Sequence, residues 1–460
     1  MTTPAVVPPI ISVAAPDLHL ARAAIAVLGR NWHGHATVPS RGLYPHQWSW
    51  DSAFIAFGLQ HWAPRRAATE LLSLFGAQWA DGRVPHIVFN PAVPDEAYFP
   101  GPSFWRSDDV DGHPPVDTSG LIQPPVHAVA AAAVMTHLGE AAEEFGRRIY
   151  PGLVAQNAYL KRSRTATGSG LAVVVHPWET GMDNSPAWDR PLAAVPADHG
   201  VFDTHTRRDL AHAGHDERPT DEDYSRYIRL AAAYRDHAYD DRWAAEHAEF
   251  AVVDPGFNAL WGWSELALAG IADRLGRDDS EHRAEAERIT AALVEELYVT
   301  HSDPGGGLFH AADDRAGSRL AERTVGGLLP LVLPGLPAAV VQELAATLRG
   351  ATFRAGSADV LGVPSFDLTA TEFDAQRYWR GPSWLNTTWL VGRGLQMHGK
   401  DELAGHLLGD VVALASRSGF REYFNPHTGT GHGSDRFSWS AALVLDVLAG
   451  REAPSREVGS

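Results

Sequence analysis

The chain has 460 residues, 45% of them apolar and 20% charged, and its formal net charge at pH 7 is −18. A chain of this length can bury a large core, as one large domain or as two to three smaller ones. The excess of acidic residues argues against nucleic acid as a partner, because phosphate binding needs concentrated lysine and arginine. The sequence contains no cysteine, which excludes disulfides, thiolate nucleophiles and cysteine-ligated metals.

The two ends of the chain differ in composition from the rest. Residues 1–15 are rich in proline and alanine and predict an extended arm, and residues 451–460 predict a flexible tail. The first residues lack the basic and apolar regions of a signal peptide, and no apolar run approaches the roughly 18 residues of a membrane helix. We therefore expect a cytoplasmic protein without membrane contact.

Apolar residues at helical spacing predict about a dozen helices along the chain. Helices that are apolar on most faces alternate with amphipathic ones, and polar loops rich in aromatic residues precede the apolar members. This alternation is typical of a closed two-layer helical barrel, in which buried helices form an inner ring and loops at one end converge on a pocket. The predicted helices cover about 16–28, 53–61, 66–79, 126–138, 141–164, a stretch that begins at the 254–258 breaker, 281–297, 324–332, 338–348, 385–397, 403–416 and 438–448.

The first aromatic loop, residues 44–52, contains Tyr44, Trp48, Trp50 and Asp51. An aspartate in this place can simply cap the helix that follows. Capping does not explain the aromatic residues around it, whose faces can stack on the apolar faces of sugar rings. We therefore favour Asp51 as an acceptor for a sugar hydroxyl.

Two long segments, about 81–120 and 186–225, exceed an ordinary connection within a compact domain and predict lids over a pocket. Gln123 follows the first segment and either faces the pocket mouth or is a solvent-facing amide. In the second segment, Arg218 lies just before a helix that Thr220 is expected to cap. This arginine either reaches an anionic group of a substrate or remains a surface residue.

Two further loops each carry a carboxylate among aromatic and polar residues. In residues 176–186, Pro177 and Gly181 prevent regular structure and place Asp183 on irregular backbone beside apolar walls. Desolvation in such a setting raises the pKa of a carboxyl, as a general acid near neutral pH requires. The alternative is a turn aspartate with an ordinary capping role.

Glu422, in the loop 420–433, is the natural partner for Asp183. Hydrolysis of a glycosidic bond needs one protonated carboxyl that donates to the leaving oxygen and one carboxylate that activates water or attacks the anomeric carbon. The sequence shows no dinucleotide, P-loop, metalloprotease or serine-hydrolase motif. His301, His310, His427 and His432 are spaced too irregularly to favour a metal site, so we expect neither metal nor cofactor.

Four stretches, 48–52, 176–183, 378–384 and 421–426, resemble glycoside hydrolase family 63. The match spans nearly the whole chain and looks most like the compact bacterial mannosylglycerate and glucosylglycerate hydrolases. The resemblance implies an all-α fold, an (α/α)6 barrel, in which residues 16–450 form a single catalytic domain and the two long segments form the lid. It also implies an inverting mechanism with Asp183 as general acid and Glu422 as general base.

The resemblance further implies where the substrate binds. The sugar in the −1 position would be held by Trp50, Asp51, Trp178, Glu179, Arg380 and Trp384. The places that hold glycerate are matched here by Tyr44, Trp48, Gln123, Arg218, Tyr378 and Trp379. Inversion requires the two catalytic carboxyls to lie roughly 6.5 to 9.5 Å apart, and we expect the loops around Tyr44 and Arg218 to close over the substrate and exclude water.

Three alternatives remain open on sequence alone. The nearest is a related α-glucosidase that acts on neutral di- or oligosaccharides with the same acid, base and sugar subsite. A sugar epimerase on the same barrel would depend on paired histidines, and a non-catalytic sugar-binding barrel is the third possibility. The sequence also leaves open the choice between glucose and mannose and the oligomeric state, since surface helices leave room for dimers or tetramers.

Overall fold

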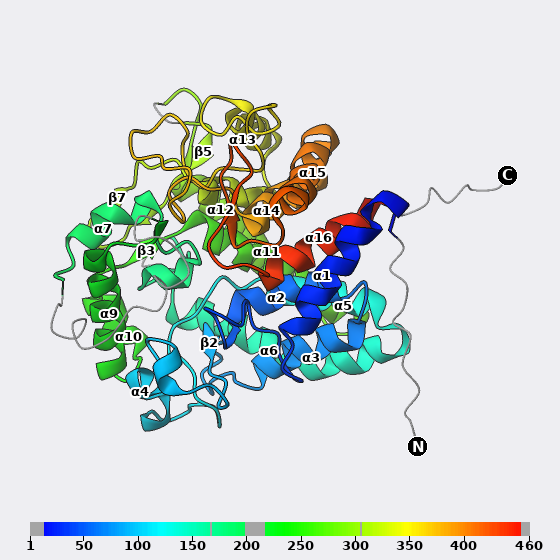
Figure 1. The fold of residues 1–460 in the computed structure, drawn as a ribbon. Helices are drawn as coiled ribbons and strands as arrows, with labels where there is room; N and C mark the ends of the chain where they lie inside the picture. Colours follow the sequence, from blue (N-terminus) through cyan, green and yellow to red (C-terminus); the bar gives the residue numbers. More distant parts are fainter. Residues whose placement is uncertain (1–12, 166–167, 198–216, 304–305, 452–460) are drawn as a thin grey trace, which may run out of the picture.

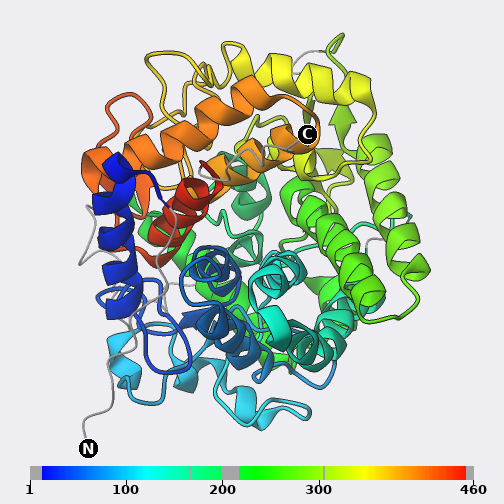
Figure 2. The same ribbon diagram turned by 90° about the vertical axis from the view of Figure 1, so that its right-hand side faces the viewer.

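The computed structural model describes residues 13–165, 168–197, 217–303 and 306–451. Almost all of the predicted arm and tail, and residues 198–216 of the second predicted lid segment, lie outside the described residues. The described chain is mainly helical and its helices are arranged as a ring (Figures 1 and 2). None of the described helices is long and apolar enough to span a membrane.

Six helical segments form the inner ring, and each packs against its two neighbours so that the ring closes. Their side chains are mostly buried, and α2 is buried at every position. A Cβ on Gly58 of α2 would lie 2.4 Å from the Cα of Ala442 in α16, so glycine lets these two helix backbones touch. The six segments are α2 (Ser49–Leu59), α5 (His127–His137), α11 (Pro255–Arg274), η9 (Val325–Val332), α14 (Leu385–Met397) and α16 (Ser438–Arg451).

Six amphipathic helices form the outer ring and run around the periphery in Figure 2. Each packs on an inner segment: α1 on α16, α3 on α2, α6 on α5, α12 on α11, α13 on η9 and α15 on α14. The predicted alternation of buried and amphipathic helices is thereby confirmed as a two-layer (α/α)6 barrel. The outer helices are α1 (Leu18–Arg30), α3 (Pro64–Phe75), α6 (Ala142–Ser163), α12 (Ser280–Glu296), α13 (Ala338–Arg349) and α15 (Asp401–Ser418).

Two inner segments differ from their predicted form. The segment η9 is a 3-10 helix, because Pro330 lacks an N–H and Gly327 lies so close to Phe309 that a Cβ would meet its carbonyl oxygen at 2.2 Å. Helix α2 begins at Ser49, four residues before the predicted start. Trp50 and Asp51 therefore lie in its first turn and are fixed by regular backbone.

Short antiparallel strands tie the loops of the barrel together. They are β1 (Gln47–Trp48) with β2 (Ile87–Val88), β4 (Tyr298–Val299) with β5 (Leu308–Phe309), β8 (Tyr423–Phe424) with β9 (Gly431–His432), and the sheet of β3 (Val252–Val253), β6 (Ala312–Asp313) and β7 (Ser318–Arg319). The pairing of β1 with β2 joins the first aromatic loop to the first predicted lid segment.

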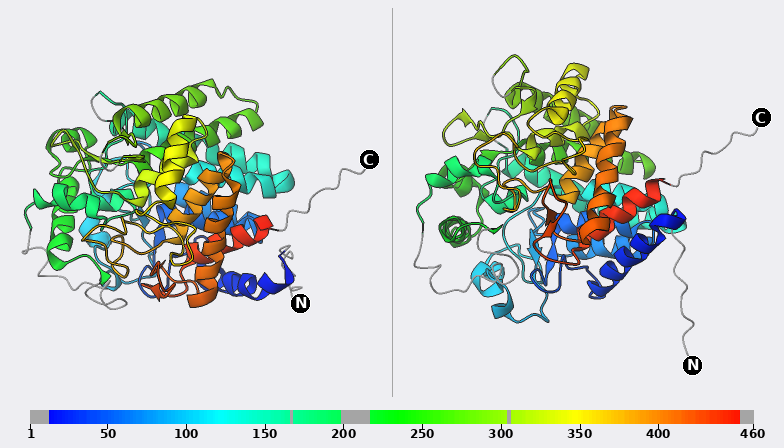
Figure 3. Two further views of the ribbon diagram at one scale, coloured as in Figure 1. Left: turned by 90° about the horizontal axis from the view of Figure 1, so that it is seen from above. Right: turned by 45° about the horizontal axis from the view of Figure 1, so that its top comes forward.

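The two predicted lid segments contain short helices. The first holds η2 (Asp95–Ala97), α4 (Pro102–Trp105) and η3 (Ser107–Asp109), and the second holds η6 (Pro186–Trp188), α7 (Asp189–Ala193) and the start of α9 (Asp221–Asp236), which α10 (Asp241–His247) follows. Helices α4 and α9 contact each other. They lie at the end of the barrel away from both ends of the described chain (Figures 1 and 3). Three single turns complete the described elements: η1 (Ala15–Asp17), η4 (Gly139–Ala141) and η5 (Pro177–Thr180).

Candidate active site

A cavity lies at this end of the barrel and encloses about 940 Å³ of space, its mouth included. The predicted site residues that line it are Tyr44, Trp48, Trp50, Asp51, Gln123, Trp178, Asp183, Arg218, Tyr378, Trp379, Trp384 and Glu422. They come from the loops before inner helices, from the first turn of α2 and from the segment before α9.

Glu422 is buried and lies just before β8. Its Oε1 accepts a hydrogen bond from the Tyr44 hydroxyl at 2.8 Å, and its Oε2 accepts from Arg218 Nη2 at 2.8 Å and from the backbone N–H of Ser434 at 2.9 Å. A Cβ on Gly433, where φ is +65°, would lie 2.4 Å from Glu422 Oε2. Glycine at this position therefore leaves room for the carboxylate.

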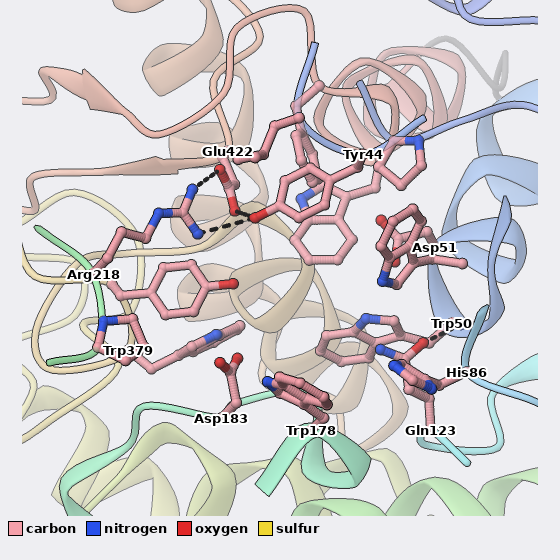
Figure 4. A pocket seen from close by; sticks show the side chains of 18 of the residues that line it. Tyr44, Trp50, Asp51, His86, Gln123, Trp178, Asp183, Arg218, Trp379 and Glu422 are labelled. Carbon is pink, nitrogen blue, oxygen red and sulfur yellow. Dashed lines mark hydrogen bonds and ion pairs between the residues drawn. The ribbon is translucent and has the colours of Figure 1, made fainter. Parts of the chain in front are cut away.

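Asp183 is half-buried on the irregular backbone that follows η5. Its loop is anchored on both sides: the Tyr227 hydroxyl donates to the Asp183 carbonyl at 2.7 Å, and the Trp188 indole donates to the Met182 carbonyl at 2.8 Å. Gly181 has a φ of +72°, and a Cβ there would lie 2.6 Å from the Trp50 ring. Figure 4 shows Asp183 and Glu422 on opposite sides of the cavity.

Aromatic rings form the walls between the two carboxyls. The rings of Trp379 and Trp384 stack with centroids 3.9 Å apart and planes 2° from parallel, and Tyr423 packs on Trp384 at 4.9 Å. On the other side, the Trp178 ring lies 6.1 Å from His86 at 22°. Such flat apolar faces beside polar groups suit the faces and hydroxyls of a sugar ring.

Asp51 is a third carboxyl in the cavity and is almost completely buried. Burial, and next the negative charge of Glu422, raise the pKa of Asp51 well above its ordinary value. A protonated Asp51 can donate a hydrogen bond to a ligand as well as accept one. Gln123 is held beside it, because its Oε1 accepts from the backbone N–H of Trp50 at 3.2 Å.

Residues 44–440 match the family model described as "Mannosylglycerate hydrolase MGH1-like glycoside hydrolase domain". The chain belongs to this glycoside hydrolase family. The mannosylglycerate hydrolase of Thermus thermophilus is 42% identical over 92% of this chain and 99% of that protein, and the glucosylglycerate hydrolase of Mycolicibacterium hassiacum is 34% identical over 93% and 97%. The resemblance to glycoside hydrolase family 63 and the prediction of an enzyme that hydrolyses glycosidic bonds are thereby confirmed.

Solved structures agree with this membership. A GH63 mannosylglycerate hydrolase from Thermus thermophilus, in complex with Tris and D-glycerate, superimposes with a TM-score of 0.83 at 40% identity, over 93% of this chain and 99% of that chain. The neutral trehalase Nth1 of Saccharomyces cerevisiae superimposes with a TM-score of 0.56 at 15% identity, over 92% of this chain and 74% of that chain, a likeness of fold alone.

Two predicted sugar contacts of this glycoside hydrolase do not line the cavity. The Glu179 carboxylate is fully buried behind it and accepts from Arg164 Nη1 and Nη2 at 2.8 and 2.7 Å. The Arg380 guanidinium makes two hydrogen bonds, of 2.8 and 2.6 Å, to Asp189 on α7. Both side chains carry polar groups in the predicted loops, but the fold turns these groups toward protein partners.

Several residues line the cavity of the glycoside hydrolase without having been predicted: Pro39, Leu43, His86, Tyr98, Phe99, Gly181, Pro219, Tyr224, Tyr227, Phe437 and Trp439. Phe437 and Trp439 stand at the start of α16, in one more aromatic stretch before an inner helix, so the same signal could have found them. His86 and Tyr98 belong to the first predicted lid segment. Tertiary contacts bring that segment to the cavity, among them the pairing of β1 with β2 and the hydrogen bond from the Tyr224 hydroxyl to the Phe99 carbonyl.

The titratable groups near the cavity are mostly carboxyls, phenols and neutral histidines. Burial lowers the pKa of His86 well below its ordinary value, and the neighbouring His176 adds to this effect. Within the described residues, no group of three or more histidine, aspartate or glutamate side chains could hold a metal ion.

Proposed function

We propose that this enzyme hydrolyses the α-glycosidic bond of glucosylglycerate or mannosylglycerate and releases hexose and glycerate. The observation that carries the proposal is the pair Asp183 and Glu422 on opposite sides of one cavity whose walls are indole rings (Figure 4). Relatives that are 34 to 42% identical over nearly the whole chain act, by their names, on these two conjugates. The relative that is 42% identical is named for mannosylglycerate, and the one that is 34% identical is named for glucosylglycerate.

In the proposed reaction, the Asp183 carboxyl donates its proton to the glycosidic oxygen as the bond to the anomeric carbon breaks. The Glu422 carboxylate takes a proton from a water molecule, whose oxygen attacks the anomeric carbon from the opposite face. The product sugar then has the inverted configuration. Asp183 lies beside the Trp178 wall and Glu422 beside Arg218, so an acid and a base are in different surroundings, as the division of roles requires.

We propose that Arg218 and Tyr44 bind the carboxylate of glycerate, and that Gln123, Trp48, Tyr378 and Trp379 complete that half of the site. Burial disfavours the charge of Arg218, but Glu422 and the phenols around it outweigh burial and raise the pKa of Arg218 well above its ordinary value. A permanently charged guanidinium inside a cavity can make paired hydrogen bonds to a carboxylate. Asp51, Trp50, Trp178 and Trp384 remain the proposed contacts of the sugar.

A panel of four substrates tests the proposal: glucosylglycerate, mannosylglycerate, trehalose and isomaltose. We expect hexose release from one or both glycerate conjugates, with the anomer formed first observed by NMR to be inverted. The Asp183→Asn variant should lose turnover with the fold intact. Turnover of the neutral disaccharides alone would overturn the glycerate assignment, and a retained anomeric configuration would overturn the mechanism.

A further inference from the structure

Arg218, Tyr44 and Glu422 form a closed triangle of hydrogen bonds in the cavity (Figure 4). Arg218 donates from Nη1 to the Tyr44 hydroxyl at 2.9 Å and from Nη2 to Glu422 Oε2 at 2.8 Å, and the Tyr44 hydroxyl donates to Glu422 Oε1 at 2.8 Å. The two groups proposed to bind the substrate carboxylate are thus the groups that bind the proposed general base. Substrate recognition and base catalysis share the same donors.

The hydrogen bonds that Arg218 and Tyr44 donate to Glu422 work against its role as a general base. The backbone N–H of Ser434 also donates to Glu422 Oε2, so the carboxylate accepts three hydrogen bonds, one of them from a full positive charge. The side chains of Arg218 and Glu422 are each only 2% exposed. A carboxylate has about four acceptor directions, and the Tyr44 hydroxyl, Arg218 and the Ser434 N–H together occupy three of those of Glu422. While Arg218 and Tyr44 are engaged in this way, little of Glu422 is open to a water molecule.

A second carboxylate in the cavity would change that balance. Arg218 packs against the Tyr378 ring, with the guanidinium carbon 4.5 Å from the ring centroid, so its charge is held at the cavity wall. Both Arg218 and Tyr44 line the cavity, so a substrate carboxylate there can accept from them. Such contacts would draw the positive charge and the Tyr44 hydroxyl away from Glu422.

We infer that Arg218 is a switch for the general base as well as a binding residue: the substrate carboxylate takes over Arg218 and Tyr44 and thereby frees Glu422 to accept the proton of water. The inference rests on the proposed function, since it needs Glu422 as the base and a carboxylate on the substrate. It adds that the substrate's own charge is required for turnover. A neutral glycoside that fits the cavity would bind and remain poorly hydrolysed.

The test compares each glycerate conjugate with the corresponding glycosylglycerol, in which a hydroxymethyl group replaces the carboxylate. For the wild type we expect kcat on the neutral analogue to be about tenfold or more below kcat on the conjugate, beyond any difference in KM. The variant Arg218→Met should lose about a hundredfold in kcat/KM on the conjugate. On the neutral analogue, the same variant should turn over several-fold faster than the wild type.

The opposite effects of Arg218→Met on the two substrates distinguish a switch from a residue that only binds the substrate or supports the fold. An arginine that only binds would leave kcat on the neutral analogue unchanged when it is removed, and a structural one would lower it. Either result overturns the inference. Arg380→Met is the matched control, because Arg380 pairs with Asp189 outside the cavity. Arg380→Met should change kcat/KM on the two substrates by the same factor.

A second measurement uses the wild-type protein and needs no variant. The α-hexosyl fluoride of the preferred sugar leaves the glycerate half of the cavity empty, and acetate can then occupy the place of the carboxylate. We expect acetate to accelerate fluoride hydrolysis relative to chloride at equal ionic strength. Inhibition, or no effect, would count against the switch. If instead no glycerate conjugate is hydrolysed in the first assay, the proposed function itself fails.

Discussion

Glu179 and Glu422 invite comparison, because each is buried, each pairs with an arginine and each pair has tyrosines around it. The Glu179–Arg164 pair lies behind the cavity, with Tyr159 and Tyr234 also bonded to the arginine. The Glu422–Arg218 pair lines the cavity, with Tyr44 between the two side chains. Residue type and burial are alike, so neither of them indicates which pair takes part in catalysis.

The difference lies in how completely each carboxylate is satisfied. Arg164 binds Glu179 through two nitrogens, and the backbone N–H groups of Val175 and Ile122 donate to it at 2.8 and 3.3 Å. Every acceptor direction faces protein, which fixes the loop that leads to Asp183. Glu422 is bound by a single guanidinium nitrogen and keeps a side toward the cavity. A carboxylate that must accept a proton needs such an open side.

The largest effect is expected from Glu422→Gln. Loss of the base should reduce kcat by about 10²- to 10⁴-fold. The melting temperature should fall as well, because glutamine keeps the shape but leaves the buried Arg218 guanidinium without its counter-charge. Hexose release and thermal unfolding, measured on the same samples, check the expected changes in kcat and in melting temperature. A variant that retains more than a tenth of the wild-type kcat would remove Glu422 from the mechanism.

The corresponding change at the other pair, Glu179→Ala, should act on stability. It leaves the charge of Arg164 buried with less compensation, and we expect the free energy of unfolding to fall by about 3 to 5 kcal/mol in urea titrations. Glu249→Ala is the control, because Glu249 also pairs with an arginine, Arg229, through two bonds, but the two side chains are 34% and 35% exposed. Its removal should cost about 0 to 1 kcal/mol. Equal losses in the two variants would contradict the contrast drawn between the pairs.

His176 adds a pH dependence to the Glu179 side of the comparison. Burial lowers the pKa of His176 from 6.5 to about 3, and its ring accepts from the Trp178 N–H at 3.0 Å. Below pH 6.5 the unfolded chain therefore binds a proton that the folded protein does not, and this residue lowers stability as the pH falls toward 3.

We expect the stability advantage of the wild type over His176→Asn to shrink by about 1.4 kcal/mol per pH unit between pH 6 and pH 4.5. Urea unfolding at three pH values across this range measures the slope. A constant difference between wild type and His176→Asn would mean that this histidine is protonated in the folded state.

The smallest expected effect concerns the helix that follows Arg218. Thr220 and Asp223 form a capping box at the start of α9: the Thr220 Oγ1 accepts from the Asp223 N–H at 3.1 Å, and the Asp223 carboxylate accepts from the Thr220 N–H at 3.3 Å. Thr220→Ala should destabilise the protein by about 1 kcal/mol. Thr220→Ser keeps the oxygen and should be nearly neutral. A kcat loss larger than the KM change in Thr220→Ala would show that the placement of Arg218 depends on this cap.

The sequence was informative wherever a local pattern is tied to a physical requirement. Periodic burial predicted the two rings, because a helix that is apolar all round must be enclosed by others. Aromatic residues beside carboxylates in the loops before inner helices pointed to Trp50, Asp51, Asp183 and Glu422, all of which line one cavity. The capping signal before α9 predicted Thr220 for a similarly local reason.

What the sequence could not decide is the direction in which a polar side chain faces. Glu179 and Asp183 are four residues apart in one loop, yet the first points to Arg164 and the second lines the cavity. Arg218 and Arg380 were both predicted to contact the substrate, yet one meets Glu422 and the other Asp189. These partners are 15 to 204 residues apart along the chain. Local composition determined which groups are available, and only the closure of the barrel, which brings distant segments together, decided which of them meet.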